Sequence, residues 1–109
     1  MSPNASPLDG HATAERRSLA FHRRVAAVLQ QEPERLELVR SKLRRSIEDA
    51  LSRSRGYALG WLQLVDGPLS ELLEFLCEDS EKARAYRQAS PFAGLLSARE
   101  RWEIWRSTR

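Results

Sequence analysis

The chain has 109 residues, of which 41% are apolar and 30% charged, with 18 Lys and Arg against 15 Asp and Glu and a formal net charge of +3. This apolar fraction excludes a wholly disordered chain, and the length predicts a single domain with an extensive solvated face. The single cysteine, Cys77, excludes a disulfide framework and a multi-cysteine metal site.

The N-terminal residues contain prolines and serines but almost no large apolar side chain. We therefore expect residues 1–13 to form a flexible tail and residues 14–109 to form one domain. The longest apolar run, Val25–Leu29, is far shorter than the roughly 20 residues that span a bilayer. Because no secretory signal pattern is present either, the sequence predicts a cytoplasmic protein with no membrane partner.

Apolar side chains spaced by three and four residues predict helices in the first half of the chain. A first helix is expected over about 14–31, with His22 beside its apolar face. Pro33 suits the first turn of a second helix, and Gly56 suits its C-terminal end. This second helix has the clearest amphipathic stripe, formed by Leu36, Val39, Leu43, Ile47, Ala50 and Leu51.

Shorter helices are predicted in the second half. An apolar helix is expected over about 57–66, another follows the Gly67-Pro68 break, and Ser80 suits the N-cap of one over about 81–89. Ser97 and Glu100 match a capping box that opens a last helix. No sustained period-two alternation predicts a strand. The predicted fold is a single all-α bundle of five to six helices.

The net charge hides an uneven distribution. Residues 1–57 carry 11 basic and 7 acidic side chains, whereas residues 58–109 carry 7 basic and 8 acidic ones. Residues 66–81 include six acidic side chains and no basic one. Such a separation of charge can steer a protein partner as well as a nucleic acid, and a dedicated DNA-binding domain usually has a clearer basic excess.

Few residues are candidates for catalysis. Arg17 and His22 have a spacing that resembles the active-site motif of HEPN-type ribonucleases, in which Arg stabilises phosphoryl charge and imidazole transfers a proton. The alternative is a partly buried structural histidine. Glu71, Glu74 and Glu78 share a helix face without an accompanying histidine, so we expect no metal site. The sequence predicts neither an enzyme nor a cofactor.

A nucleic-acid-binding regulator is a further alternative. The basic face at residues 40–45 could contact phosphates. The helix predicted over 57–66 is too apolar to enter a DNA groove, because a recognition helix needs polar side chains there. We therefore expect Trp61 in the core, and direct DNA binding is not favoured.

The end of the chain combines arginines, a proline turn at Ser90-Pro91-Phe92-Ala93-Gly94 and an aromatic-rich helix. Trp and Arg are the residues most enriched at binding hot spots. At least two of Phe92, Trp102 and Trp105 are expected to close the core, with one aromatic half exposed. The candidate partner-binding or loop-defining residues are Arg87, Pro91, Phe92, Arg101 and Trp102.

Three stretches, Ser18–Arg23, Trp61–Leu69 and Arg87–Leu96, resemble a bacterial helical domain. That domain follows a helix-turn-helix in small regulators that are similar to antitoxins of toxin–antitoxin pairs. Its most distinctive motif is the Ser-Pro-Phe-Ala-Gly loop. The chain departs from the pattern because no helix-turn-helix precedes these stretches, which puts operator binding in doubt. The resemblance implies no catalytic residues.

Together these patterns predict a protein–protein interaction module, an antitoxin-like or regulatory partner of a bacterial toxin or enzyme encoded nearby. A homodimer stays open. The alternatives are the HEPN-like ribonuclease or toxin that uses Arg17 and His22, and the nucleic-acid-binding regulator.

Overall fold

The computed structural model describes residues 7–49 and 55–108 and confirms the all-α prediction. Over these residues the chain forms six α-helices and no strand. No helix within this part of the chain combines the length and the apolar character needed to cross a membrane. The helices are α1 (Pro7–Gln31), α2 (Leu36–Glu48), α3 (Arg55–Asp66), α4 (Leu69–Leu76), α5 (Glu81–Gln88) and α6 (Ala98–Ser107).

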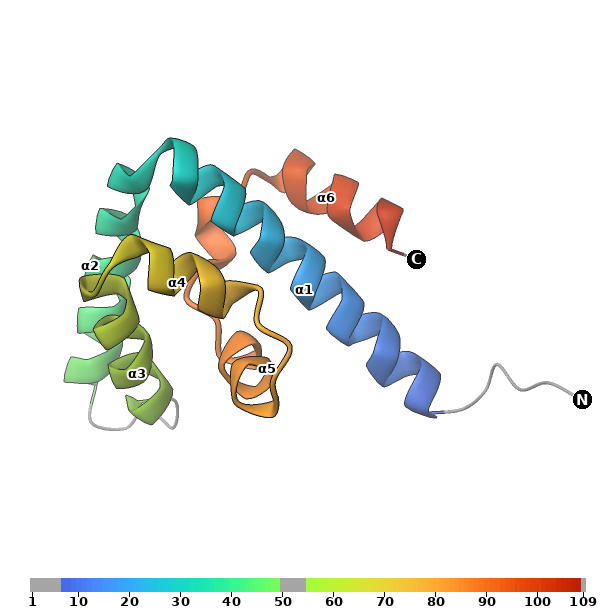
Figure 1. Ribbon diagram of the computed structural model, residues 1–109, viewed down its shortest axis with the longest axis horizontal. Coiled ribbons are helices and arrows are strands. Elements are labelled where there is room, and N and C mark those ends of the chain that lie inside the picture. The colour runs from blue at the N-terminus through green and yellow to red at the C-terminus, as the bar shows by residue number, and fades with distance from the viewer. Residues whose placement is uncertain (1–6, 50–54, 109) are drawn as a thin grey trace, which may run out of the picture.

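Helix α1 is the longest element, and three other helices pack against it. Helices α4 and α5 contact α1 from one side and α6 lies along another side (Figure 1). Helices α2 and α3 run antiparallel to each other near the C-terminal end of α1 (Figure 1). This arrangement places α5 and α6 beside the part of α1 that carries the candidate residues Arg17 and His22.

Helix α1 begins earlier than the sequence predicted. Its first residue is Pro7, whereas the predicted start was about Ala14, so the second half of the predicted tail is helical. Proline fits the first turn of a helix, and Gly10 costs only about 1 kcal/mol in a helix interior. The rest of the predicted tail lies outside the described residues.

The α2–α3 region also differs from the prediction in detail. A short 3-10 turn at Pro33–Arg35 precedes α2. Helix α2 ends at Glu48, and Ala50 and Leu51, which were predicted to extend its stripe, lie outside the described residues. Gly56 does not terminate α2 but lies in the first turn of α3, and its φ angle is not positive. No left-handed cap therefore forms at this glycine.

Both predicted serine caps are confirmed. Ser80 precedes α5, and its hydroxyl accepts a hydrogen bond from the Ala83 amide at 3.1 Å. Ser97 precedes α6 and forms a complete capping box with Glu100. The Ser97 amide donates to the Glu100 carboxylate at 3.1 Å, and the Glu100 amide donates to the Ser97 hydroxyl at 3.1 Å. The bond from the Ser97 amide to the carboxylate is the main cause that lowers the pKa of Glu100.

The core is centred on Trp61, which is fully buried as predicted. Its ring makes edge contacts with Phe75, Tyr86 and Phe92, with ring centroids 5.6, 5.6 and 5.2 Å away. The Trp61 indole N–H donates to the Tyr86 carbonyl at 3.0 Å, so its polar atom is satisfied in the core. This aromatic cluster joins α3, α4 and α5 to the loop before α6.

Candidate functional site

His22 is buried and both of its ring nitrogens are engaged. Its side chain is 2% exposed. Nδ1 lies 2.6 Å from the Ser18 carbonyl, and Nε2 lies 2.8 Å from the Ser90 hydroxyl. Because a carbonyl only accepts, Nδ1 carries the proton and Nε2 accepts one from Ser90. Burial lowers the pKa of His22 to about 4, so the ring is neutral near physiological pH.

The Ser-Pro-Phe-Ala-Gly loop is fixed by the same serine. The Ser90 hydroxyl accepts from the Phe92 amide at 3.2 Å while it donates to His22. Phe92 is fully buried against the core, and Pro91 is buried beside α2. Of the candidates at this loop, Phe92 and Pro91 therefore define its shape, and neither offers a large exposed surface.

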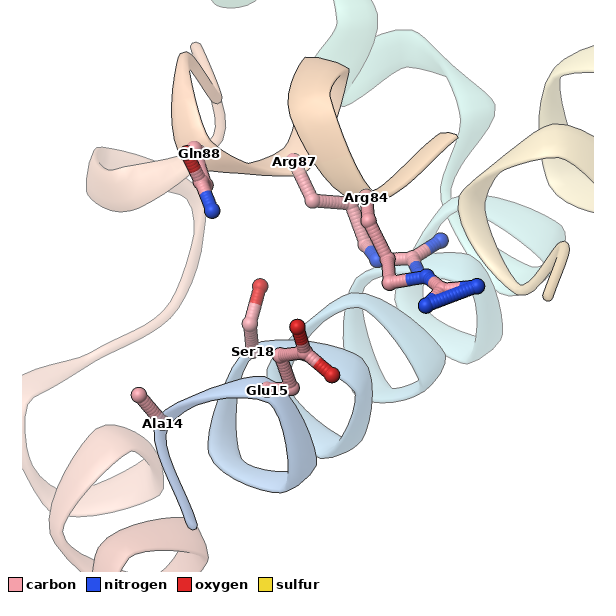
Figure 2. A pocket seen from close by; sticks show the side chains of 6 residues that line it. All are labelled: Ala14, Glu15, Ser18, Arg84, Arg87 and Gln88. Atoms are coloured by element: carbon pink, nitrogen blue, oxygen red, sulfur yellow. The ribbon is translucent and has the colours of Figure 1, made fainter. Parts of the chain in front are cut away.

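Arg87 is also buried. Its side chain is 6% exposed, and Nη1 donates to the carbonyls of Glu78 and Leu76 at 2.8 and 3.4 Å. These bonds hold the segment between α4 and α5 against α5. Burial and the nearby charge of Arg84 lower the pKa of Arg87. Arg87 thus has a structural position, and its guanidinium reaches a cleft between α1 and α5 (Figure 2).

Arg17 and His22 have different surroundings in the structure. Its guanidinium lies over the ring of Trp105 on α6, 4.9 Å from the ring centroid. Its Nε atom is buried and has no hydrogen-bond partner among the described residues. His22 instead faces the core and the Ser90 hydroxyl. With a neutral, occluded imidazole, this arrangement favours structural roles for both residues.

Helix α6 presents an exposed aromatic pair. Trp102 is 53% exposed and Trp105 is 38% exposed. Their rings are stacked, with centroids 5.1 Å apart and planes inclined by 16°. Arg101 lies on the same side of α6, one turn from Trp105, and donates to the Ala93 carbonyl at 3.3 Å. We call this surface, formed by Arg17, Arg101, Trp102 and Trp105, the tryptophan face.

The expectation that two of the three aromatic candidates close the core is wrong. Phe92 is buried, but Trp102 and Trp105 are both exposed. The inward position on α6 is taken by Ile104, which packs against the core cluster. Because residues at i and i+3 share one side of a helix, both tryptophans point away together once Ile104 points inward.

The tryptophan face lies on two arginine-rich helices. Helices α1 and α6 contact each other, and Arg24 pairs with Glu100 at 3.5 Å. Since Arg17 meets Trp105 and Arg24 meets Glu100, the two helices run antiparallel. Over their described side chains, seven arginines outnumber three glutamates. The arginines are Arg16, Arg17, Arg23, Arg24, Arg99, Arg101 and Arg106, and the glutamates are Glu15, Glu100 and Glu103.

The basic face proposed for nucleic acid is partly occupied. Arg40 pairs with Asp66 at 2.7 Å and with Glu37, and it donates to the Val65 carbonyl at 3.2 Å. These partners raise the pKa of Arg40 and tie α2 to the end of α3. Lys42, Arg44 and Arg45 remain exposed, so only part of this face is available to phosphates.

The acidic residues Glu71, Glu74 and Glu78 are exposed on or just after α4. Among the residues that the structure describes, no group of three His, Cys, Asp or Glu side chains could hold a metal ion.

Comparison of the chain with protein-family models, curated proteins and solved structures finds no match.

Sequence reasoning missed two relationships that shape the site. Nothing in the spacing of residues indicated that His22 meets Ser90 or that Arg17 covers Trp105, because each pair is distant in sequence. A local signal did exist for the tryptophan pair, since Trp102 and Trp105 lie at i and i+3. That signal predicts a shared side of the helix but not which side faces solvent.

Proposed function

We propose that this chain is a protein-interaction module that binds an acidic protein partner through the tryptophan face. The observation that carries the proposal is the stacked pair of Trp102 and Trp105, which stays exposed with Arg17 and Arg101 beside it. Large rigid aromatic rings lose little conformational entropy on binding, and Trp and Arg dominate binding hot spots.

The charge of this surface supports an acidic partner. Arginines predominate on α1 and α6, and guanidinium groups form bidentate pairs with carboxylates. Complementary charge also speeds the encounter of two proteins. In keeping with the resemblance of the sequence to antitoxin-like regulators, the proposed partner is a toxin or enzyme encoded nearby.

Co-expression tests this proposal. The neighbouring gene product is expressed alone, with this chain, and with a Trp102→Ala variant. We expect growth arrest by the product alone, relief and co-purification with the unchanged chain, and loss of both with the variant. Leu59→Ala is the matched control, because Leu59 is 47% exposed on α3, away from α6.

Other outcomes distinguish other occupants of the same surface. A harmless neighbouring product that does not co-purify overturns the antitoxin-like proposal. Self-association that Trp102→Ala abolishes would identify a second copy of the chain as the occupant. Binding of single-stranded nucleic acid that weakens steeply with salt and is lost in Trp102→Ala would replace the protein partner with a nucleic acid.

A further inference from the structure

A small cleft lies between α1 and α5. It is lined by Ala14, Glu15 and Ser18 of α1 and by Arg84, Arg87 and Gln88 of α5, and its volume is about 90 Å³. Figure 2 shows the Ser18 hydroxyl and the Glu15 carboxylate turned toward the side chains of α5. We call this space between α1 and α5 the arginine cleft. Its volume is far below the roughly 300 Å³ at which pockets begin to hold whole small molecules, so it suits a single chemical group.

The buried arginine in this cleft has no ion-pair partner among the described residues, although Glu78 and Asp79 attract it at longer range. Arg87 is 6% exposed, and among the described residues its guanidinium donates to the carbonyls of Leu76 and Glu78. Within the described residues, no carboxylate forms an ion pair with it. Burying a cation without a paired anion is costly. A ligand that brings negative charge would offset that cost.

A second arginine reinforces the positive charge. Arg84 lies one turn before Arg87 on α5, and its nearest carboxylate is Asp79 at 3.5 Å. The Asp79 side chain is 92% exposed, so this pair is screened by water and weak. Arg84 also donates from Nε to the Ser80 carbonyl at 3.3 Å, so its remaining guanidinium N–H groups are the ones that would share an anion with Arg87.

Neutral donors complete the set. The Ser18 hydroxyl and the Gln88 amide line the same cleft from opposite sides. Two guanidinium groups, one hydroxyl and one amide outnumber the two oxygens of a carboxylate but suit the three or more oxygens of a phosphate. From this set of donors we propose that the arginine cleft binds one phosphate group.

Glu15 is expected to affect phosphate binding in the opposite direction to the arginines. Its carboxylate lies in the cleft, and no ion pair or hydrogen bond of this side chain is formed with the described residues. Like charges in one small site repel each other, so Glu15 opposes the entry of phosphate. Removing its charge therefore strengthens binding, whereas removing an arginine weakens it. The proposal does not depend on the tryptophan face, because Arg17 meets α6 while its neighbour Ser18 faces α5.

A titration of the full chain with inorganic phosphate, monitored by NMR, tests the site. We expect amide shifts at residues 14–18 and 84–88. Arg84→Gln is expected to weaken binding about tenfold, as for loss of one charge-assisted hydrogen bond. Glu15→Gln is expected to strengthen it roughly threefold, because the carboxylate is exposed and screened. Arg84→Gln is preferred to Arg87→Gln because Arg87 also holds two main-chain carbonyls.

Arg99→Gln is the control, because Arg99 is an exposed arginine of α6 whose change removes the same charge outside the cleft. It is expected to bind phosphate like the unchanged chain. Equal weakening by Arg99→Gln and Arg84→Gln, or the absence of shifts at the cleft, overturns the proposal. Acetate that binds as tightly as phosphate also overturns it, in favour of a carboxylate site.

Two sources of phosphate can be separated in the same titration. A phosphoserine peptide that shifts the same amides at lower concentration than inorganic phosphate identifies a phosphorylated protein segment as the ligand. If inorganic phosphate binds more tightly than the peptide, the free ion is the ligand, because the cleft is then too small for a phosphate ester.

Discussion

The imidazole of His22 and the hydroxyl of Ser90 form a hydrogen bond of 2.8 Å across 68 positions of sequence. Through this bond the loop before α6 is tied to the middle of α1. The hydrogen-bond network continues at both ends. The Phe92 amide donates to the Ser90 hydroxyl, and His22 Nδ1 donates to the Ser18 carbonyl. His22 thus joins α1 to the loop that carries the core aromatic Phe92.

The burial of neutral His22 makes the stability of the fold depend on pH. The unfolded histidine binds a proton below about pH 6.5, whereas the folded one does so only below about pH 4. Between these values the unfolded state binds more protons, so the free energy of unfolding falls as the pH falls. The loss approaches about 3 kcal/mol and is complete near pH 4.

Urea unfolding at neutral pH and near pH 4 measures this loss. A His22→Gln variant removes the titrating group, and we expect its stability to depend less steeply on pH over the same interval. Titration of the His22 ring by NMR provides a second readout, with a midpoint near pH 4 expected in the folded chain. Equal pH dependence in both chains, or an imidazole midpoint near 6.5, contradicts the account.

Ser90→Ala removes the link between the loop and α1. The substitution leaves Nε2 of His22 and the Phe92 amide without the Ser90 hydroxyl as hydrogen-bond partner, and unsatisfied buried groups cost about 1–3 kcal/mol. We expect the free energy of unfolding to fall by that amount. Ser70→Ala on the exposed side of α4 is the control and is expected to change stability by less than about 0.5 kcal/mol. Similar effects at both serines would show that the link has no special role.

Substitution of glycine by alanine is expected to have opposite effects on stability at two positions of α3. A methyl group at Gly60 would lie 2.7 and 2.8 Å from ring carbons of Tyr86, which is packed against Trp61. Gly60→Ala therefore overpacks the core and is expected to destabilise the fold by about 1–3 kcal/mol. Gly56 has open space around it, and Gly56→Ala is expected to stabilise α3 by up to about 1 kcal/mol. Thermal unfolding of the two variants in parallel decides the point, and changes of the same sign would contradict this packing.

The capping box stabilises the first turn of α6. Ser97→Ala removes the hydroxyl that accepts from the Glu100 amide, and loss of a serine cap costs about 1 kcal/mol. We expect faster amide hydrogen exchange in the first turn of α6, with little change in α3. Because Trp102 and Trp105 lie on this helix, the fluorescence of the stacked pair is expected to change as well. Unchanged exchange in α6 would show that tertiary contacts alone hold the helix.

The sequence predicted what is decided locally. The capping box at Ser97 and the cap at Ser80 follow from side chains that reach only three residues along the chain. The amphipathic spacing around Leu36, Val39 and Leu43 likewise predicted which side of α2 is buried. These features need no knowledge of how the helices pack.

The features that could not be predicted depend on packing between distant segments. Arg87 belongs to a residue type typical of binding surfaces, but it is buried, and its Nη1 donates to the carbonyls of Leu76 and Glu78. The tryptophans of α6 belong to a type typical of cores, but Ile104 takes the inward position. In both cases the neighbouring element, which the spacing does not specify, determines exposure.

The affinity of the neighbouring gene product for the chain and its Trp102→Ala variant tests the tryptophan face most directly. Truncation of a hot-spot residue costs at least about 2 kcal/mol, so we expect binding of the variant to weaken by roughly thirtyfold or more. Leu59→Ala, which changes an exposed apolar side chain on α3, is expected to bind like the unchanged chain. Binding that is equally tight for Trp102→Ala and for the unchanged chain would contradict the proposal that the tryptophan face holds the partner.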